Sequence, residues 1–323
     1  MREVIVPCGD LDAAIAAFEA VGFALELVLP ADDPALAVVS RDGARIRLVR
    51  GDAGDVRDED ALRVALARPA LRPALVVTIA RDRDWHRGRA GMTYRDLVPD
   101  RLGGWLVASH VRIADGGPVA DYVHFHDLRA QILYCRAGSA QLVYEDQGEP
   151  FVMHPGDCIV QPPRIRHRVL GCSPGLEVIE VAMPAAHATY ADRALALPTA
   201  IGDPERRWSG QRFAWLRGDE LPWTDVPGGH RVRAFDLSRA LGDGWAARRL
   251  DLRGALARSS SAVAFGFVLA GRAELVAGGA RHALGRDDAF CIPPGEHVTL
   301  AGSPDADVLE LELPSHDVPV PQV

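Results

Sequence analysis

The sequence predicts a mainly β protein made of two β-barrels of similar sequence, preceded by a small α+β module. Three observations support this prediction. From about residue 94, short apolar and β-branched runs alternate with Gly, Pro and Asp turns, as in a sandwich or small barrel. Two stretches of that region resemble each other at a spacing of about 130 residues. The part before it begins with helical periodicity followed by strand-like runs.

The N-terminal part, residues 2–50, is predicted to form a strand, a helix and further strands. Asp10 is a suitable N-cap for a helix over 11–20, whose apolar residues recur at helical spacing as far as Phe18. Gly22 is a natural stop for this helix. Strands are expected over 4–6, 23–29, 35–40 and 44–49, with a hairpin turn at 41–43.

This pattern, with Asp10-Leu-Asp-Ala-Ala-Ile-Ala-Ala-Phe-Glu-Ala-Val-Gly-Phe at its helix, resembles one βαββ module of the glyoxalase and bleomycin-resistance (vicinal oxygen chelate) group. That group pairs such modules around a metal, and the resemblance would place its first-strand His near Glu3. No second module follows, so residues 1–52 are interpreted as a vestigial or structural module. The alternative is an unrelated α+β element that packs on a barrel or on a partner subunit.

The rest of the chain divides into three predicted parts. Residues 53–91 are charged and Ala-rich, and are interpreted as a linker or packing segment with a short helix over 58–66 and a strand over 74–80. Residues 92–198 form the first barrel and residues 199–323 the second. The start of the second part, rich in Trp, Arg and Pro, is expected to join the barrels.

The first barrel contains the clearest chemical pattern. His124 and His126 lie two apart on a predicted strand, so both imidazoles face the same side. Gln131 follows after a predicted turn, and His167 comes about forty residues later, beyond a Gly-Asp turn and the Pro-Pro break at 162–163. Three imidazoles and one amide oxygen that converge from two strands would form a site for a divalent transition metal.

This arrangement resembles the metal site of cupins, which combines HxH and a downstream acidic or amide residue with one His from a second motif. The resemblance implies two double-stranded β-helix (jelly-roll-like) barrels, a bicupin from about residue 92. It also implies one divalent transition metal per chain, with Fe(II) favoured and Mn, Ni, Co, Cu or Zn equally compatible with imidazole. Cupins usually have Glu at the place of Gln131, and a neutral amide is a weaker ligand that leaves the site one negative charge poorer.

The second barrel lacks these ligands. The repeat aligns Gly138 with Gly271, and equal counting from these glycines gives the second-barrel positions of the HxH pair and of the amide as Ala257, Ser259 and Ala264. His297 is nearby but one residue out of register. Because one imidazole cannot hold a catalytic metal, the second barrel is predicted to be structural or dimerising. The alternative is that it binds a small molecule without metal.

Other residues near the motifs are candidates for catalysis. On a regular strand Tyr122 shares the face of the ligands and could act as a proton donor; the alternative is a core Tyr bonded to backbone. Arg166, together with Arg164, flanks His167 at the expected barrel mouth and could clamp a substrate carboxylate; the alternative is an exposed arginine. Gln161 could face the pocket or the outside, because the Pro break leaves its parity open.

Three functions fit such a site. The first is a metal-dependent dioxygenase acting on a small oxygenated acid, enol or phenol, as the resemblance implies. The second is an isomerase or lyase in which the metal is a Lewis acid. The third is a sensor or binding protein without turnover. In each case the partner is a small molecule, for the enzymes a carboxylate or enol.

Composition argues against other classes. The net charge is −8, and no basic cluster is present to neutralise phosphates, so no nucleic-acid partner is expected. No apolar run is long enough to span a bilayer, and the start lacks the pattern of a signal peptide. The five scattered cysteines fit free thiols in a reducing compartment. We therefore expect a cytoplasmic protein, and a homodimer because cupins commonly dimerise through sheet edges.

Overall fold

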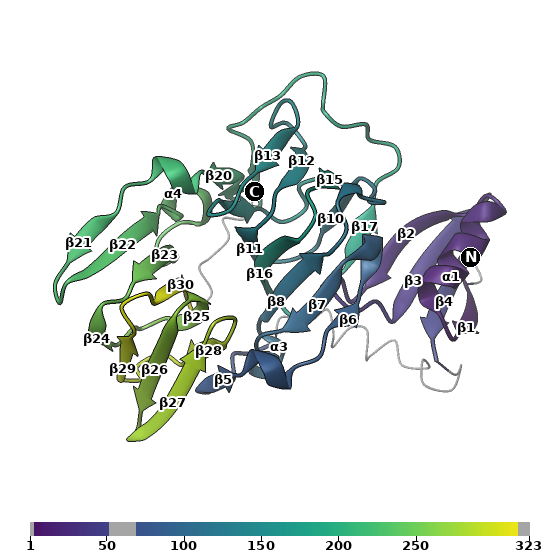
Figure 1. Ribbon diagram of the computed structural model, residues 1–323. Coiled ribbons are helices and arrows are strands. Elements are labelled where there is room, and N and C mark those ends of the chain that lie inside the picture. The colour runs from purple at the N-terminus through teal and green to yellow at the C-terminus, as the bar shows by residue number, and fades with distance from the viewer. Residues whose placement is uncertain (1–2, 52–68, 316–323) are drawn as a thin grey trace.

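The computed structural model describes residues 3–51 and 69–315, and it has the mainly β architecture predicted from the sequence. Figure 1 shows three parts in a row: the N-terminal module, the first barrel beside it and the second barrel on the far side. The helix predicted over 58–66 lies outside the described residues. No helix in the described ranges is both long enough and apolar enough to cross a membrane.

The N-terminal module has the predicted order of elements. They are β1 (Glu3–Cys8), α1 (Leu11–Ala20), β2 (Ala24–Leu29), β3 (Leu36–Arg41) and β4 (Ala44–Arg50). The Asp10 carboxylate accepts a hydrogen bond from the backbone N–H of Ala13 at 2.9 Å, which confirms the predicted N-cap. β1 runs parallel to β4, whereas β2, β3 and β4 are antiparallel. The helix covers one face of this sheet, and its buried Leu11 packs there with Leu25 and Leu48.

The first barrel consists of two facing sheets. Its strands are β6 (His86–Arg87), β7 (Thr93–Asp96), β8 (Val107–Ile113), β9 (Gly117–Pro118), β10 (His124–His126), β11 (Ala130–Ala137), β12 (Ala140–Tyr144), β13 (Phe151–Met153), β14 (Cys158–Gln161), β15 (His167–Cys172), β16 (Leu176–Met183) and β17 (Thr189–Ala191). One sheet has the order β17-β10-β15-β12-β13, and β2 of the N-terminal module extends it by pairing with β17. The other has the order β20-β14-β11-β16-β8-β7-β6, in which β20 is Ala214–Leu216.

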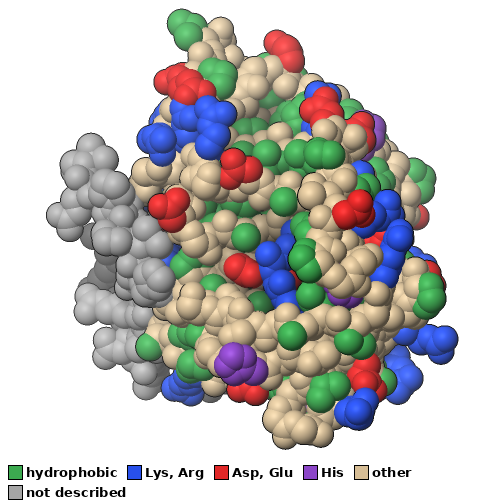
Figure 2. Space-filling view, turned by 90° about the vertical axis from the view of Figure 1, so that its left-hand side faces the viewer, with side chains coloured by type: hydrophobic (Ala, Val, Ile, Leu, Met, Phe, Trp, Pro, Cys, Tyr) green, Lys and Arg blue, Asp and Glu red, His purple; other side chains and the backbone are tan. Residues whose placement is uncertain are grey.

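The second barrel repeats this plan. Its strands are β21 (Thr224–Val226), β22 (His230–Phe235), β23 (Ala246–Asp251), β24 (Gly254–Arg258), β25 (Val263–Ala270), β26 (Arg272–Ala277), β27 (Ala280–Gly285), β28 (Ala289–Ile292), β29 (Val298–Gly302) and β30 (Asp307–Leu313). Short elements connect the parts: η1 (Ala80–Asp82), η2 (Arg89–Gly91), α3 (Arg101–Gly104), β18 (Arg207–Trp208), β19 (Gln211–Arg212), η3 (Gly218–Glu220) and α4 (Ser238–Leu241). Figure 2 views the second-barrel side, where acidic and basic side chains are interspersed.

Besides β6, which lies in the predicted linker and joins the first barrel, two strands cross the domain boundaries that the sequence suggested. β5 (Val76–Thr78) comes before the first barrel in the chain, yet it pairs with β28 of the second. β20 (Ala214–Leu216) follows residue 199, yet it pairs with β14 of the first barrel. Each barrel therefore takes an edge strand from chain outside its predicted range.

The barrels are packed back to back through an apolar core, because their strands alternate between two buried faces. In β11, Ile132 and Tyr134 face the second barrel, whereas Gln131 and Leu133 face the interior of the first. β30 does the same from the other side, with Leu309 and its alternate neighbours in the shared core.

Strand pairing corrects one equivalence taken from sequence counting. Gln131 lies opposite Gln161 and Ala264 lies opposite Ile292, in agreement with the predicted match of Gln131 and Ala264. However, His124 lies opposite His167, and the corresponding pair in the second barrel is Arg258 with Val298. The counterpart of His124 is therefore Arg258 instead of Ala257. Counting failed because the chain from this position to the shared glycine is one residue shorter in the second barrel.

Candidate metal centre

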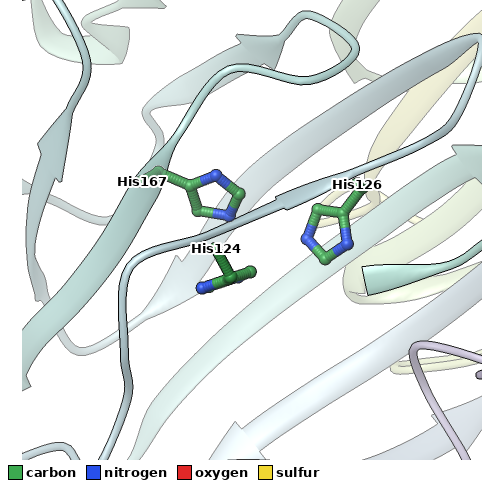
Figure 3. Close-up of side chains that lie close together, drawn as sticks. All are labelled: His124, His126 and His167. Atoms are coloured by element: carbon green, nitrogen blue, oxygen red, sulfur yellow. The ribbon is translucent and has the colours of Figure 1, made fainter. Parts of the chain in front are cut away.

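Three histidines from two neighbouring strands meet inside the first barrel. β10 supplies His124 and His126, and β15 begins at His167, which pairs with His124 across the ladder. One ring nitrogen of each lies within 4.8 Å of the others, and Figure 3 shows the imidazoles gathered around a common space. Within the described residues this is the one group of three or more His, Cys, Asp or Glu side chains found with such spacing. The structure thus brings together the three predicted histidines.

Hydrogen bonds on the outer side orient these rings. Nδ1 of His124 donates to the backbone carbonyl of Tyr122 at 2.7 Å, and Nδ1 of His167 donates to that of Ile165 at 3.0 Å. A carbonyl can only accept, so the proton of each ring is on Nδ1 and the Nε2 lone pair is directed inward. Nδ1 of His126 lies 2.7 Å from the hydroxyl of Thr189. Such outer contacts are typical of metal-binding histidines.

Burial keeps all three imidazoles neutral. It places the pKa of His124 and of His126 well below the ordinary value, and the Arg89 guanidinium and neighbouring histidines add to the effect. Burial also lowers the pKa of His167 to about 4. Neutral imidazole is the form that binds metal, so no proton has to leave these rings at neutral pH.

Gln131 lies in the same cavity, within a chain of amide hydrogen bonds. Its Oε1 accepts a hydrogen bond from Nε2 of Gln161 at 2.7 Å, and its Nε2 donates to Glu180 at 2.5 Å. Nε2 of Gln161 is also 3.2 Å from Nε2 of His167, while Gln161 Oε1 accepts from the Tyr144 hydroxyl at 2.9 Å. Gln161 therefore faces the pocket. Gln131 Oε1 keeps a second lone pair, so it remains available as a fourth ligand.

Glu180 is a site residue that the sequence reading missed. It lies on β16, where Leu176, Val178 and Glu180 all line the cavity because they alternate along the strand. Burial raises the pKa of its carboxyl, and the hydrogen bond from Gln131 only partly opposes this. The signal for Glu180 in the sequence was a single acidic residue on the otherwise apolar inner face of a strand.

Arg89 is a second missed residue, and it brings a positive charge to the histidines. Its Nη2 lies 2.6 Å from Nε2 of His124, and its Nη1 lies 2.6 Å from the buried carboxylate of Asp121. Burial alone would lower the pKa of Arg89, but the Asp121 carboxylate, together with Tyr94 and Tyr122, outweighs it and the pKa is raised. This contact could not be predicted from the sequence, because Arg89 lies in the segment interpreted as a linker.

The two predicted catalytic side chains have other surroundings. The Tyr122 ring packs against the core of the N-terminal module and, edge to face, against His124. The guanidinium of Arg166 lies over the ring of Phe125 and pairs with Asp192 at 3.1 Å. Neither of the two side chains lines the cavity. Arg164 also lies over Phe125, at the edge of the barrel.

The cavity itself is polar around the histidines and apolar elsewhere. Its polar wall includes Arg89, His126, Gln131, Gln161, His167 and Glu180. Its apolar wall includes Leu133, Leu142, Met153, Val169, Leu176 and Val178. A mostly apolar cavity with a few converging polar groups is the usual form of a small-molecule site.

Comparison with known proteins places the fold but not the activity. No protein-family model and no curated protein sequence matches the chain. Among solved structures, the oxalate decarboxylase of Lactobacillus farciminis with formate is similar at 12% identity and a TM-score of 0.56, over 78% of this chain and 89% of that chain. Salicylate 1,2-dioxygenase of Pseudoaminobacter salicylatoxidans with gentisate is similar at 14% identity and a TM-score of 0.55, over 81% of this chain and 91% of that chain. Streptomyces albus HEPD with 2-hydroxyethylphosphonate and Fe(II) is similar at 12% identity and a TM-score of 0.53, over 74% of this chain and 76% of that chain.

These neighbours are cupin proteins, so the predicted cupin fold is confirmed. They include metal-dependent dioxygenases and a decarboxylase, and the histidine cluster described above could bind a metal.

Proposed function

We propose that the protein is a metal-dependent enzyme of dioxygenase type that acts on a small oxygenated organic acid. One divalent transition metal per chain, Fe(II) in our proposal, would be held by Nε2 of His124, His126 and His167. The observation that carries the proposal is the orientation of the buried neutral rings, whose outer nitrogens are held by hydrogen bonds so that their inner nitrogens converge. Gln131 is the proposed fourth ligand through Oε1.

The donor set fits such a metal. Imidazole nitrogen and amide oxygen suit Fe(II) as well as its first-row neighbours, and three or four protein ligands leave positions open for a substrate. When bound, a redox-active metal would supply the activation of O2 and the polarisation of substrate oxygen atoms. Four neutral ligands leave the charge of the ion uncompensated, which favours an anionic substrate.

Arg89 is the proposed anchor of the substrate's negative charge. Its Nη2 now occupies the Nε2 lone pair of His124, so a cation at the histidines requires Arg89 to release that contact. Its Nη1 can stay paired with Asp121, which would keep the guanidinium in the cavity wall. The freed N–H groups then match a carboxylate or enolate, the role that the sequence reading gave to Arg166.

A non-redox isomerase or lyase is the second candidate, and Glu180 favours it. The raised pKa of this carboxyl means that it can hold a proton beside Gln131 and the histidines. A reaction that moves a proton next to a metal-polarised oxygen atom needs such a group. In this case Glu180 would exchange the proton while the metal stabilises an enolate.

Metal content and oxygen dependence separate the candidates. Protein purified without added metal is analysed for elements per chain, then assayed with salicylate, gentisate and small 2-hydroxy acids, with and without O2. About one Fe per chain and substrate-dependent O2 uptake support the dioxygenase. Turnover under anaerobic conditions with Zn or Co supports the isomerase or lyase. Protein that holds no metal, even after reconstitution, contradicts both.

A further inference from the structure

The N-terminal module reaches into the cavity of the first barrel. β2 pairs with β17, and β17 pairs with β10, the strand of His124 and His126. The segment that follows β2 therefore enters the barrel beside these histidines. Ala31 and Asp32 from this segment line the cavity together with His126 and Glu180.

Asp32 is held in this position with one oxygen unused. Its side chain is buried, with the residue 7% exposed, and Oδ2 accepts a hydrogen bond from Arg101 at 2.8 Å. Oδ1 is also buried, and no group in the described part of the chain donates a hydrogen bond to it. A buried carboxylate oxygen without a donor is unfavourable, so a bound molecule that supplies one would be stabilised.

His187 presents a second unused acceptor to the same cavity. The residue is 2% exposed, and its ring lies 5.5 Å from that of His126. Nδ1 donates to the carbonyl of Pro184 at 2.9 Å, so Nε2 carries a lone pair. No described group donates to this Nε2. Asp32, His187 and Glu180 all line this cavity, and the negative charge of Asp32 acts to raise the pKa of the other two groups.

The close approach of the module is built into the backbone. A Cβ atom at Gly88 would lie 2.3 Å from the Tyr94 ring and 3.0 Å from the carbonyl oxygen of Asp32. Glycine at this position therefore permits the segment around Asp32 to pack directly on the wall of the first barrel.

We propose that the N-terminal module completes the pocket, and that Asp32 with His187 recognises a hydroxyl or amino group on the bound molecule. This inference rests on the proposed function for the identity of the pocket as the active site. Two acceptors without donors select a ligand that brings donors, because a ligand that lacks them leaves both groups unpaired. The substrate class is thus narrowed to an acid that also carries a hydroxyl or amino group.

Matched ligands test this assignment. The probes are benzoate with its three monohydroxy derivatives and anthranilate, and propionate with lactate and alanine. Binding to Zn-loaded protein is measured by calorimetry, so that turnover does not interfere. We expect at least one donor-bearing probe to bind about tenfold more tightly than its parent. Asp32→Asn should reduce this ratio to below about threefold.

Controls separate this proposal from the proposed function. Asp33→Asn removes the next carboxylate, which pairs with Arg50 outside the cavity, and should keep the full ratio. Asp32→Asn should retain its metal. If the proposed metal site is wrong, the wild-type protein itself will bind no metal. His187→Phe is the second variant and should reduce the same ratio. A ratio that survives in both variants, or no preference in the wild type for any donor-bearing probe, would overturn the inference.

Discussion

In the first barrel one sheet pairs Gln131 with Gln161, through β11 and β14, and the facing sheet pairs His124 with His167, through β10 and β15. At the corresponding positions of its two sheets, the second barrel pairs Ala264 with Ile292 and Arg258 with Val298. The backbone frame is therefore shared, whereas the side chains that fill it differ.

The acids on the last long strand of each barrel show what this difference does. Glu180 and Glu310 occupy the same ladder position, since Glu180 lies opposite Leu133 and Glu310 opposite Gly266. Glu310 is fully buried and receives hydrogen bonds from Arg248 at 2.8 Å and from Arg258 at 2.6 Å. In the first barrel, Ser109 stands where Arg248 would be.

The second barrel thus pairs its interior charges with one another, while the first leaves lone pairs directed into a cavity. A closed set of ion pairs offers nothing to a metal or a ligand, and it satisfies buried charges that would otherwise be costly. A few substitutions on one frame are therefore enough to separate a structural barrel from a candidate metal site.

The largest expected effect is loss of metal from the first barrel. His126→Ala removes one of three converging nitrogens, and we expect metal to fall from about one per chain to about a tenth or less. Elemental analysis of the purified variant measures this. Ser259→Ala, just after β24 in the second barrel, is the control and should leave metal content unchanged. Full occupancy in His126→Ala would show that the site was assigned wrongly.

Transferring the second barrel's arginine should also abolish the site. Ser109→Arg places a guanidinium opposite Glu180, as Arg248 lies opposite Glu310, and adds a further cation to the cavity wall beside Arg89 and Arg112. We expect metal affinity to fall at least tenfold, because a nearby positive charge opposes a divalent cation. Metal titration followed by calorimetry measures the change, with Ser109→Ala as the control. Unchanged affinity would mean that the charge pattern does not separate the barrels.

The two acids should differ in their effect on stability. Glu310→Gln removes the more deeply buried of the two carboxylates that Arg248 and Arg258 share and leaves them with Glu312, so the free energy of unfolding should fall by about 3 kcal/mol. Glu180→Gln removes a carboxyl that receives an amide hydrogen bond and no guanidinium bond among the described contacts, so the change should stay within about 1 kcal/mol. Denaturant titration of metal-free protein compares them. Equal losses would contradict the contrast.

The smallest expected effect concerns Arg89, the cavity arginine that contacts His124. Arg89→Met frees the lone pair of His124 and removes a positive charge, so metal affinity should rise severalfold. Binding of benzoate to the metal-loaded variant should weaken, because the proposed anchor is lost. The measurement is the affinity for metal and the affinity for benzoate, which should change in opposite directions. A fall in both affinities would assign Arg89 to holding the histidines in place.

The sequence supplied the parts of the site whose spacing is local. His124 and His126 follow from strand alternation, and Gln131 and His167 were predicted from turn signals together with the resemblance to the cupin motif. Arg89, Asp32 and Glu180 could not be predicted, because they meet the histidines through contacts between segments far apart in the chain. The homodimer and the cytoplasmic location stay predictions.

The same limit applies to the fold. Regular strands and the N-cap at Asp10 were readable from periodicity and residue type. The pairing of β5 with β28 was not, because nothing in a three-residue apolar run specifies which of two similar sheets it joins.

The pairing of β5 with the second barrel and of β20 with the first limits how the protein can be divided into stable fragments. A fragment that ends near residue 198 would lack β20, the partner of β14. A fragment that starts near residue 199 would lack β5, the partner of β28. Each fragment would expose an unpaired edge strand and its side of the shared apolar core, and both favour aggregation. The pair should therefore melt in a single calorimetric transition, and domain dissection will require fragments that keep both borrowed strands.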